Sequence, residues 1–245
     1  MRTSIAIGLA GTMWAGMAVF AGVTWAEGAA SATATGLEAP SSTKSVKLPN
    51  DGSITCAYYP DVTVRALVLD SESNPVVSFI KAANAPCKPG KVAGAVGYDA
   101  TLGLIGRKGS LYVFADATGI DVYDFATRKR IHRGEVARAA DGLSPADPKG
   151  MVVSADAAGL GIGYRHEVYE TCSILKDKAC WGKLAKLAGL TGDLAKQAPN
   201  CAAAYKAANA QPDFTSAVGF RRDVTIAPDG KVSVKVSGPV SCRSL

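Results

Sequence analysis

Histidine is almost absent from this sequence, and its scarcity limits the chemistry that the chain can perform. The 245 residues include only two, His132 and His166. His166 begins a segment that resembles a His-Glu-x-x-His zinc motif, but Glu170 stands where the second histidine would be needed. On a strand, His166 and Glu170 would share a face with Tyr164. These three residues are the candidates for a polar catalytic pocket, and the simpler interpretation is that they are ordinary strand residues.

Motifs of other enzyme classes are also missing. The sequence has no Gly-x-Ser-x-Gly nucleophile elbow and no phosphate-binding glycine loop, and its Ser-x-x-Lys pairs lack the companion motifs of penicillin-recognising enzymes. Asp116, Asp121 and Asp124 could gather around a calcium ion, but their spacing fits no calcium loop and aspartate is common in turns. We therefore predict no metal and no cofactor.

All six cysteines lie after residue 26, and none forms a Cys-x-x-Cys motif. The missing motif argues against both thiol–disulfide exchange and a structural zinc site. An even number of cysteines in an exported chain predicts three disulfides, for which fifteen pairings are open. We favour a local Cys172–Cys180 loop, a Cys56–Cys87 bridge in the first half, and a Cys201–Cys242 bridge that fastens the end of the chain.

The N-terminus predicts export. Arg2 precedes an apolar run over residues 5–25, and Thr24 and Ala26 place small residues at the cleavage positions. We predict a signal peptide over residues 1–26, cleaved after Ala26, and a periplasmic or secreted protein with no stable membrane span after cleavage. The apolar run is also long enough to cross a bilayer, so a retained anchor is the alternative.

The remaining chain predicts one folded domain behind a tether. Residues 27–50 are rich in Ala, Ser, Thr and Pro without apolar periodicity, which favours a flexible or extended tether. Residues 51–245 begin with alternating apolar residues typical of strands, turn helical between Cys172 and Asn209, and end in a hairpin around Asp229. The predicted fold class is α+β: an antiparallel sheet, a C-terminal helical pair and a closing β-hairpin, held by disulfides.

The clearest local structure is a hairpin over residues 110–133 with a basic end. Its apolar strands, 111–114 and 120–123, are expected in the middle of the sheet. The basic end is a candidate anion-contact surface, although cations on an edge strand also prevent sheet aggregation. Aromatic residues do not alternate with the cations, so nucleic acid binding is not predicted. The anion-contact candidates are Arg128, Lys129, Arg130 and Arg133.

Two resemblances accompany these patterns. Residues 119–131 resemble the outer hairpin of a β-propeller blade, but the helical region after Thr171 leaves no room for the several blades that a propeller needs. The whole chain resembles small exported bacterial proteins that combine a signal peptide, several cysteines and a Cys-x7-Cys-Trp helix, here Cys172 to Trp181. This resemblance implies no activity.

The functional prediction is a non-catalytic binding or interaction protein of the cell envelope. With 27 basic and 21 acidic residues, the chain has a net charge of +6, a modest excess that favours loose contact with anionic partners without specifying any. The partner could be an anionic envelope component or a protein, and the simpler interpretation is a basic exported protein with no anionic partner. The alternative is a cell-envelope hydrolase that uses His166 and Glu170.

Overall fold

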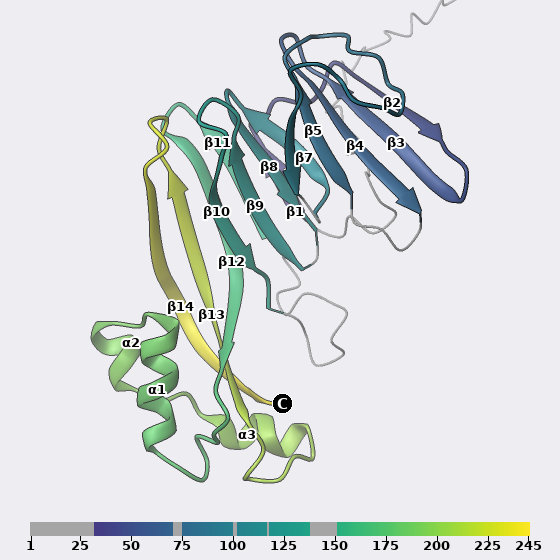
Figure 1. Ribbon diagram of the computed structural model, residues 1–245. Helices are drawn as coiled ribbons and strands as arrows, with labels where there is room; N and C mark the ends of the chain where they lie inside the picture. The colour runs from purple at the N-terminus through teal and green to yellow at the C-terminus, as the bar shows by residue number, and fades with distance from the viewer. Residues whose placement is uncertain (1–31, 71–74, 100–101, 117, 138–150) are drawn as a thin grey trace, which may run out of the picture.

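Three β-sheets stack face to face, and three short helices pack beside the last sheet (Figure 1). This computed structural model describes residues 32–70, 75–99, 102–116, 118–137 and 151–245. The predicted signal peptide, residues 1–26, lies outside the described residues. The predicted α+β class is confirmed: the strands are mostly antiparallel, and the helices precede the two closing strands.

The N-terminal sheet is an antiparallel meander in which each strand pairs with the next along the chain. Its alternating side chains place one row, including Val64 and Phe79, in a core shared with the middle sheet. Its strands are β2 (Ser42–Lys47), β3 (Asp51–Tyr58), β4 (Thr63–Asp70), β5 (Val76–Ile80) and β6 (Val96–Asp99).

The middle sheet is covered on both faces. Tyr112 and Phe114 face the N-terminal sheet, whereas Leu111 and Val113 face the C-terminal sheet, and every residue of β8 and β9 is buried. The hairpin strands therefore lie in the middle of the molecule, as their mainly apolar sequences predicted. The strands are β7 (Leu104–Lys108), β8 (Leu111–Ala115), β9 (Gly119–Asp124) and β10 (Lys129–Glu135).

The C-terminal sheet contains the longest strands and carries the helices. The lower halves of β12, β13 and β14 extend past the other sheets and form a separate core with the helices (Figure 1). The strands are β1 (Ala32–Thr35), β11 (Met151–Asp156), β12 (Gly159–Tyr169), β13 (Ser216–Ile226) and β14 (Val232–Ser244). The helices are α1 (Ala179–Ala188), α2 (Gly192–Lys196) and α3 (Cys201–Ala207), one more than the predicted pair.

The tether prediction for residues 27–50 is wrong from residue 32 onward. β1 pairs in parallel with β11, and β2 pairs with β3. β2 is an edge strand whose side chains are almost all exposed, and main-chain bonds and a 3.0 Å contact between the Ser45 and Thr55 hydroxyls hold it in place. An exposed edge strand needs no apolar periodicity, so composition alone could not reveal it. Residues 27–31 lie outside the described residues.

The cysteines form the three favoured bridges, Cys56–Cys87, Cys172–Cys180 and Cys201–Cys242. They fit an oxidising environment outside the cytoplasm. In the described part of the chain, no helix is long and apolar enough to cross a membrane.

Candidate functional site

A β-bulge in β10 determines where the predicted anion-contact residues point. The register between β10 and β9 shifts between Arg130 and His132, so Arg130 lies opposite Tyr123 and Arg133 lies opposite Asp121. Residues three apart on a regular strand face opposite sides, whereas the extra residue of a bulge restores a common side. Arg130 and Arg133 therefore both lie on the face of β9 and β10 that is turned toward the N-terminal sheet.

Arg128 occupies an unusual backbone conformation in the turn before β10. Its φ of 58° is in the left-handed region, which a non-glycine residue adopts at a cost of about 1–3 kcal/mol. The Asp124 carboxylate stabilises this turn by accepting hydrogen bonds from the Ala126 amide, at 3.0 Å, and the Thr127 hydroxyl, at 2.7 Å. Burial opposes ionisation of Asp124, but a hydrogen bond with the Ser110 side chain, together with those from Thr127 and Ala126, outweighs it and keeps the pKa of the carboxyl below its usual value.

These arginines line a cavity of about 460 Å³ between β10 and β6, which we call the arginine groove. β10 and β6 are edge strands of adjacent sheets, and residues from both meet in the cavity. Lys129, the fourth predicted contact residue, does not line it. The lining residues are Val96, Gly97, Tyr98, Asp121, Tyr123, Arg128, Arg130 and Arg133.

A single carboxylate, that of Asp121, faces the three arginines. Its side chain is 5% exposed, and its Oδ2 accepts a 3.0 Å hydrogen bond from the Tyr98 hydroxyl and lies 3.6 Å from Arg130 Nη1. Burial, followed by the Asp121 charge, raises the pKa of Tyr98, which keeps the tyrosine a donor. Three guanidinium groups against one carboxylate leave the groove with an excess of positive charge.

No family model, curated protein or solved structure matches this chain. The arrangement of the site therefore has to be interpreted from its own chemistry.

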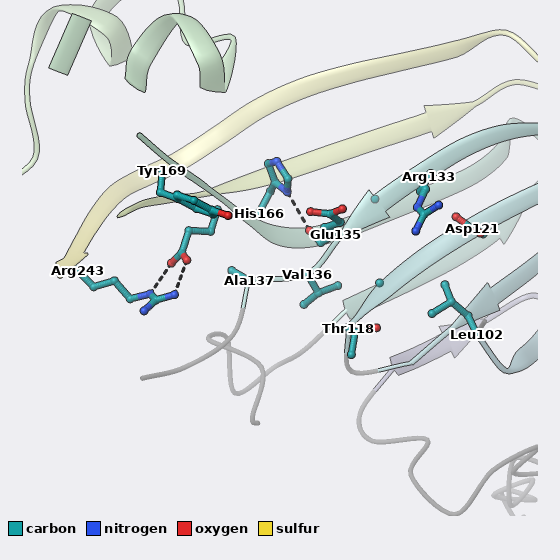
Figure 2. Close-up of a pocket in the computed structure, with 13 residues that line it drawn as sticks. Leu102, Thr118, Asp121, Arg133, Glu135, Val136, Ala137, His166, Tyr169 and Arg243 are labelled. Atoms are coloured by element: carbon teal, nitrogen blue, oxygen red, sulfur yellow. Dashed lines mark hydrogen bonds and ion pairs between the residues drawn. The ribbon is translucent and has the colours of Figure 1, made fainter. Parts of the chain in front are cut away.

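A second cavity, of about 380 Å³, is lined by residues of β9 and β10 and by residues of β12 and β14, and Figure 2 shows these residues. The His166 ring donates a 2.9 Å hydrogen bond from Nδ1 to the Glu135 carbonyl oxygen. Because a carbonyl only accepts, a neutral His166 carries its proton on Nδ1 and a lone pair on Nε2. Glu167 on the same strand makes a two-pronged ion pair with Arg243, at 2.7 and 2.5 Å.

The predicted constellation of His166, Glu170 and Tyr164 is only partly assembled. Tyr164 and His166 are neighbours on β12, with ring centroids 6.4 Å apart. Glu170 lies beyond the last residue of β12 and does not line the cavity, where Glu135 and Glu167 are the glutamates. The strand stops because the chain turns toward the Cys172–Cys180 bridge, so the strand alternation assumed for Glu170 does not apply.

Both histidines of the chain lie near Tyr164, although 34 residues separate them in sequence. The His132 ring, on β10, is 6.2 Å from the Tyr164 ring, and a Cβ added at Gly134 would lie 2.5 Å from the Tyr164 hydroxyl oxygen. Glycine at this position thus lets β10 approach β12 closely. Sequence reasoning missed this pairing because the two histidines belong to different sheets.

The aspartates considered for calcium serve different local contacts. Asp116 accepts hydrogen bonds from the amides of Thr118 and Gly119, and Asp124 supports the next turn. Among the described residues, no group of three or more His, Cys, Asp or Glu side chains could hold a metal ion.

The two histidines should make the protein less stable in weak acid. Burial lowers the pKa of His132 and of His166, with Arg222 as a further cause in both. The unfolded chain therefore takes up protons before the folded one, and stability is lost as the pH falls through about 6.5, the unfolded value. Between pH 7.5 and pH 5.5, urea unfolding should show a loss of roughly 1 kcal/mol, because both rings keep some solvent contact.

A His132→Gln/His166→Gln double variant provides the control for this pH dependence. Its free energy of unfolding should be flatter between pH 7.5 and 5.5 than that of the wild type. Equal slopes for the two proteins would mean that the histidines do not carry the effect.

Proposed function

We propose that this chain is an extracytoplasmic, non-catalytic binding domain whose arginine groove takes an anionic group of a cell-envelope component. The observation that carries the proposal is the convergence of Arg128, Arg130 and Arg133 on one cavity. The β10 bulge and the left-handed conformation of Arg128 both contribute to this convergence. Backbone strain concentrates at functional sites, and guanidinium groups bind carboxylate or phosphate oxygens with two parallel hydrogen bonds.

The chemistry of the groove favours binding over turnover. Guanidinium groups stay protonated at all physiological pH values, so they hold an anion but do not exchange protons with it. The hydrolase alternative is weakened because Glu170 does not join His166 in the cavity. A protein that only protected a sheet edge would need cations along the edge, but not three of them gathered around one cavity.

The finer location follows from the N-terminal segment. We propose export by a cleaved signal peptide over residues 1–26, giving a periplasmic or secreted protein, and the three disulfides agree with an oxidising compartment. Mass spectrometry of the mature N-terminus tests cleavage, because a chain that still begins at Met1 would contradict it.

Replacing Arg128 with glycine should weaken binding while it stabilises the fold. Glycine adopts a φ of 58° without steric cost, so Arg128→Gly should raise the free energy of unfolding by about 0.5–1 kcal/mol. It also removes one charged hydrogen-bond donor, and affinity should fall on the order of tenfold. Isothermal titration with galacturonate, inorganic phosphate and sulfate measures binding, and urea unfolding measures stability.

Asn209→Gly provides a matched control. Asn209 has a φ of 50° and lies after α3, outside the groove, so glycine should stabilise the chain there without changing anion binding. The proposal fails if none of the three anions binds the wild type, or if Arg128→Gly binds them as tightly as the wild type does.

A further inference from the structure

The arginine groove and the second cavity share part of their walls. Asp121 and Arg133 line both of them. In Figure 2 these two residues lie at one end of the second cavity, and Tyr169 and Arg243 lie at the other. The two cavities are therefore consecutive parts of one depression that follows β10. β10 has 7 residues, which at about 3.3 Å each gives the strand a length of roughly 20 Å, and the lining residues extend beyond both of its ends.

The two ends of this depression differ in chemistry. The arginine end offers three guanidinium groups beside the rings of Tyr98 and Tyr123. At the other end, the Tyr169 side chain is 62% exposed, and His166 presents an Nε2 lone pair. Because the Glu167 carboxylate is already paired with Arg243, this end adds little net charge.

Carboxylates lie near the arginines. A ligand that fits both kinds of side chain has an acidic group for the arginines and hydrogen-bond donors for the carboxylates. The Glu135 carboxylate only accepts hydrogen bonds, so it suits a ligand hydroxyl and repels a second anionic group. The Asp121 carboxylate is buried and already bonded to Tyr98, so it contributes its negative charge to this repulsion. An exposed tyrosine ring offers a flat apolar surface with a polar tip, which matches the faces and rim of a sugar ring. A dense polyphosphate or an anionic membrane surface would meet both carboxylates unfavourably.

An extended acidic peptide fits this depression less well. Peptides bind sheet edges by continuing the main-chain ladder, and a bulge interrupts that ladder on the edge strand. The bulge of β10 lies between Arg130 and His132, in the middle of the depression. A ligand recognised through side chains does not need a regular edge.

We infer that the depression along β10 binds an extended oligosaccharide with a single uronate, whose carboxylate lies at the arginine end and whose neutral sugar units reach Tyr169. This inference rests on the proposed function, because it takes the arginine groove as the anion site. Beyond the proposed function, it specifies the class of ligand and places the ligand along β10, from the arginines toward Tyr169. Binding at linked positions raises affinity without changing either contact, so chain length is the property to test.

Isothermal titration with galacturonate and with a tetramer of one terminal galacturonate and three neutral sugars tests the inference. The wild type should bind the tetramer at least about tenfold more tightly than the monomer. In Tyr169→Ala this ratio should fall to near one. Phe214→Ala is the matched control, since Phe214 is an aromatic residue with 47% exposure outside both cavities, and it should keep the wild-type ratio.

The outcomes separate the inference from the proposed function. Equal affinities for monomer and tetramer in the wild type would overturn the extended site and leave the anion site standing. A tetrapeptide of one glutamate and three neutral residues that binds as tightly as this tetramer would overturn the assignment to saccharides. If no anion binds, the proposed function fails first.

Discussion

Removing the Cys201–Cys242 bridge should cost this protein about 4 kcal/mol of its free energy of unfolding, given its sequence separation of 41 residues. The bridge connects α3 to β14, and both cysteines belong to the core between the helices and the C-terminal sheet. Without it, the unfolded chain gains the entropy of a long open loop. The double variant Cys201→Ser/Cys242→Ser should therefore lose about a quarter to four fifths of a typical stability margin of about 5–15 kcal/mol.

The stability lost on removing a bridge should increase with the length of the loop that the bridge closes. Cys172–Cys180 closes a separation of 8 residues, so its removal should cost only about 2.5 kcal/mol. Urea unfolding of the two double-serine variants, followed by far-ultraviolet circular dichroism, gives the comparison. A larger loss for Cys172→Ser/Cys180→Ser than for the long bridge would contradict the loop-entropy argument. Wild-type protein with added dithiothreitol should be less stable than either variant.

Local patterns in the sequence indicated the strands of the hairpin and favoured the bridges that form. Residues 111–114 are apolar throughout and residues 120–123 are apolar except for Asp121, which favours strands covered on both faces, and β8 and β9 are buried throughout. The favoured cysteine pairs join neighbours along the chain, and the order of the elements brings such neighbours together. These predictions needed no knowledge of how the sheets stack.

The site could not be predicted to the same degree. Sequence showed the cations of the basic end, but the bulge at Arg130 and the left-handed turn at Arg128 depend on pairing with β9. The partners in the groove, Asp121 and Tyr98, come from a neighbouring strand and another sheet. Glu170 was assigned to the wrong environment because strand alternation was continued past Tyr169, where the strand ends.

Arg107 was also missed, and it occupies the most connected polar position between the first two sheets. Its side chain is 9% exposed and makes ion pairs with Glu38, at 2.9 Å, and Asp61, at 2.6 Å. Its guanidinium carbon lies 4.5 Å from the centre of the Tyr59 ring, and its Nη1 donates to the Tyr112 hydroxyl at 3.2 Å. One side chain thus links the segment after β1, the turn between β3 and β4, and the middle sheet.

Arg107→Met should lower the free energy of unfolding by about 3 kcal/mol, because it breaks a buried, hydrogen-bonded charge cluster. Glu38 and Asp61 are partly hydrated, with side chains 47% and 65% exposed, so the loss stays at the lower end of what a buried ion pair costs. Arg107→Lys should recover only part of it, since an ammonium group cannot reach both carboxylates and stack on Tyr59 in the same geometry.

Lys196→Met is the comparison that isolates burial. Lys196 pairs with Asp193 at 3.1 Å, but both side chains are exposed, and such pairs contribute less than about 1 kcal/mol. Urea unfolding at neutral pH should therefore separate the two variants by about 2 kcal/mol or more. Similar losses for Arg107→Met and Lys196→Met would show that the stacking of the N-terminal and middle sheets depends on their shared aromatic core and not on the arginine that joins them.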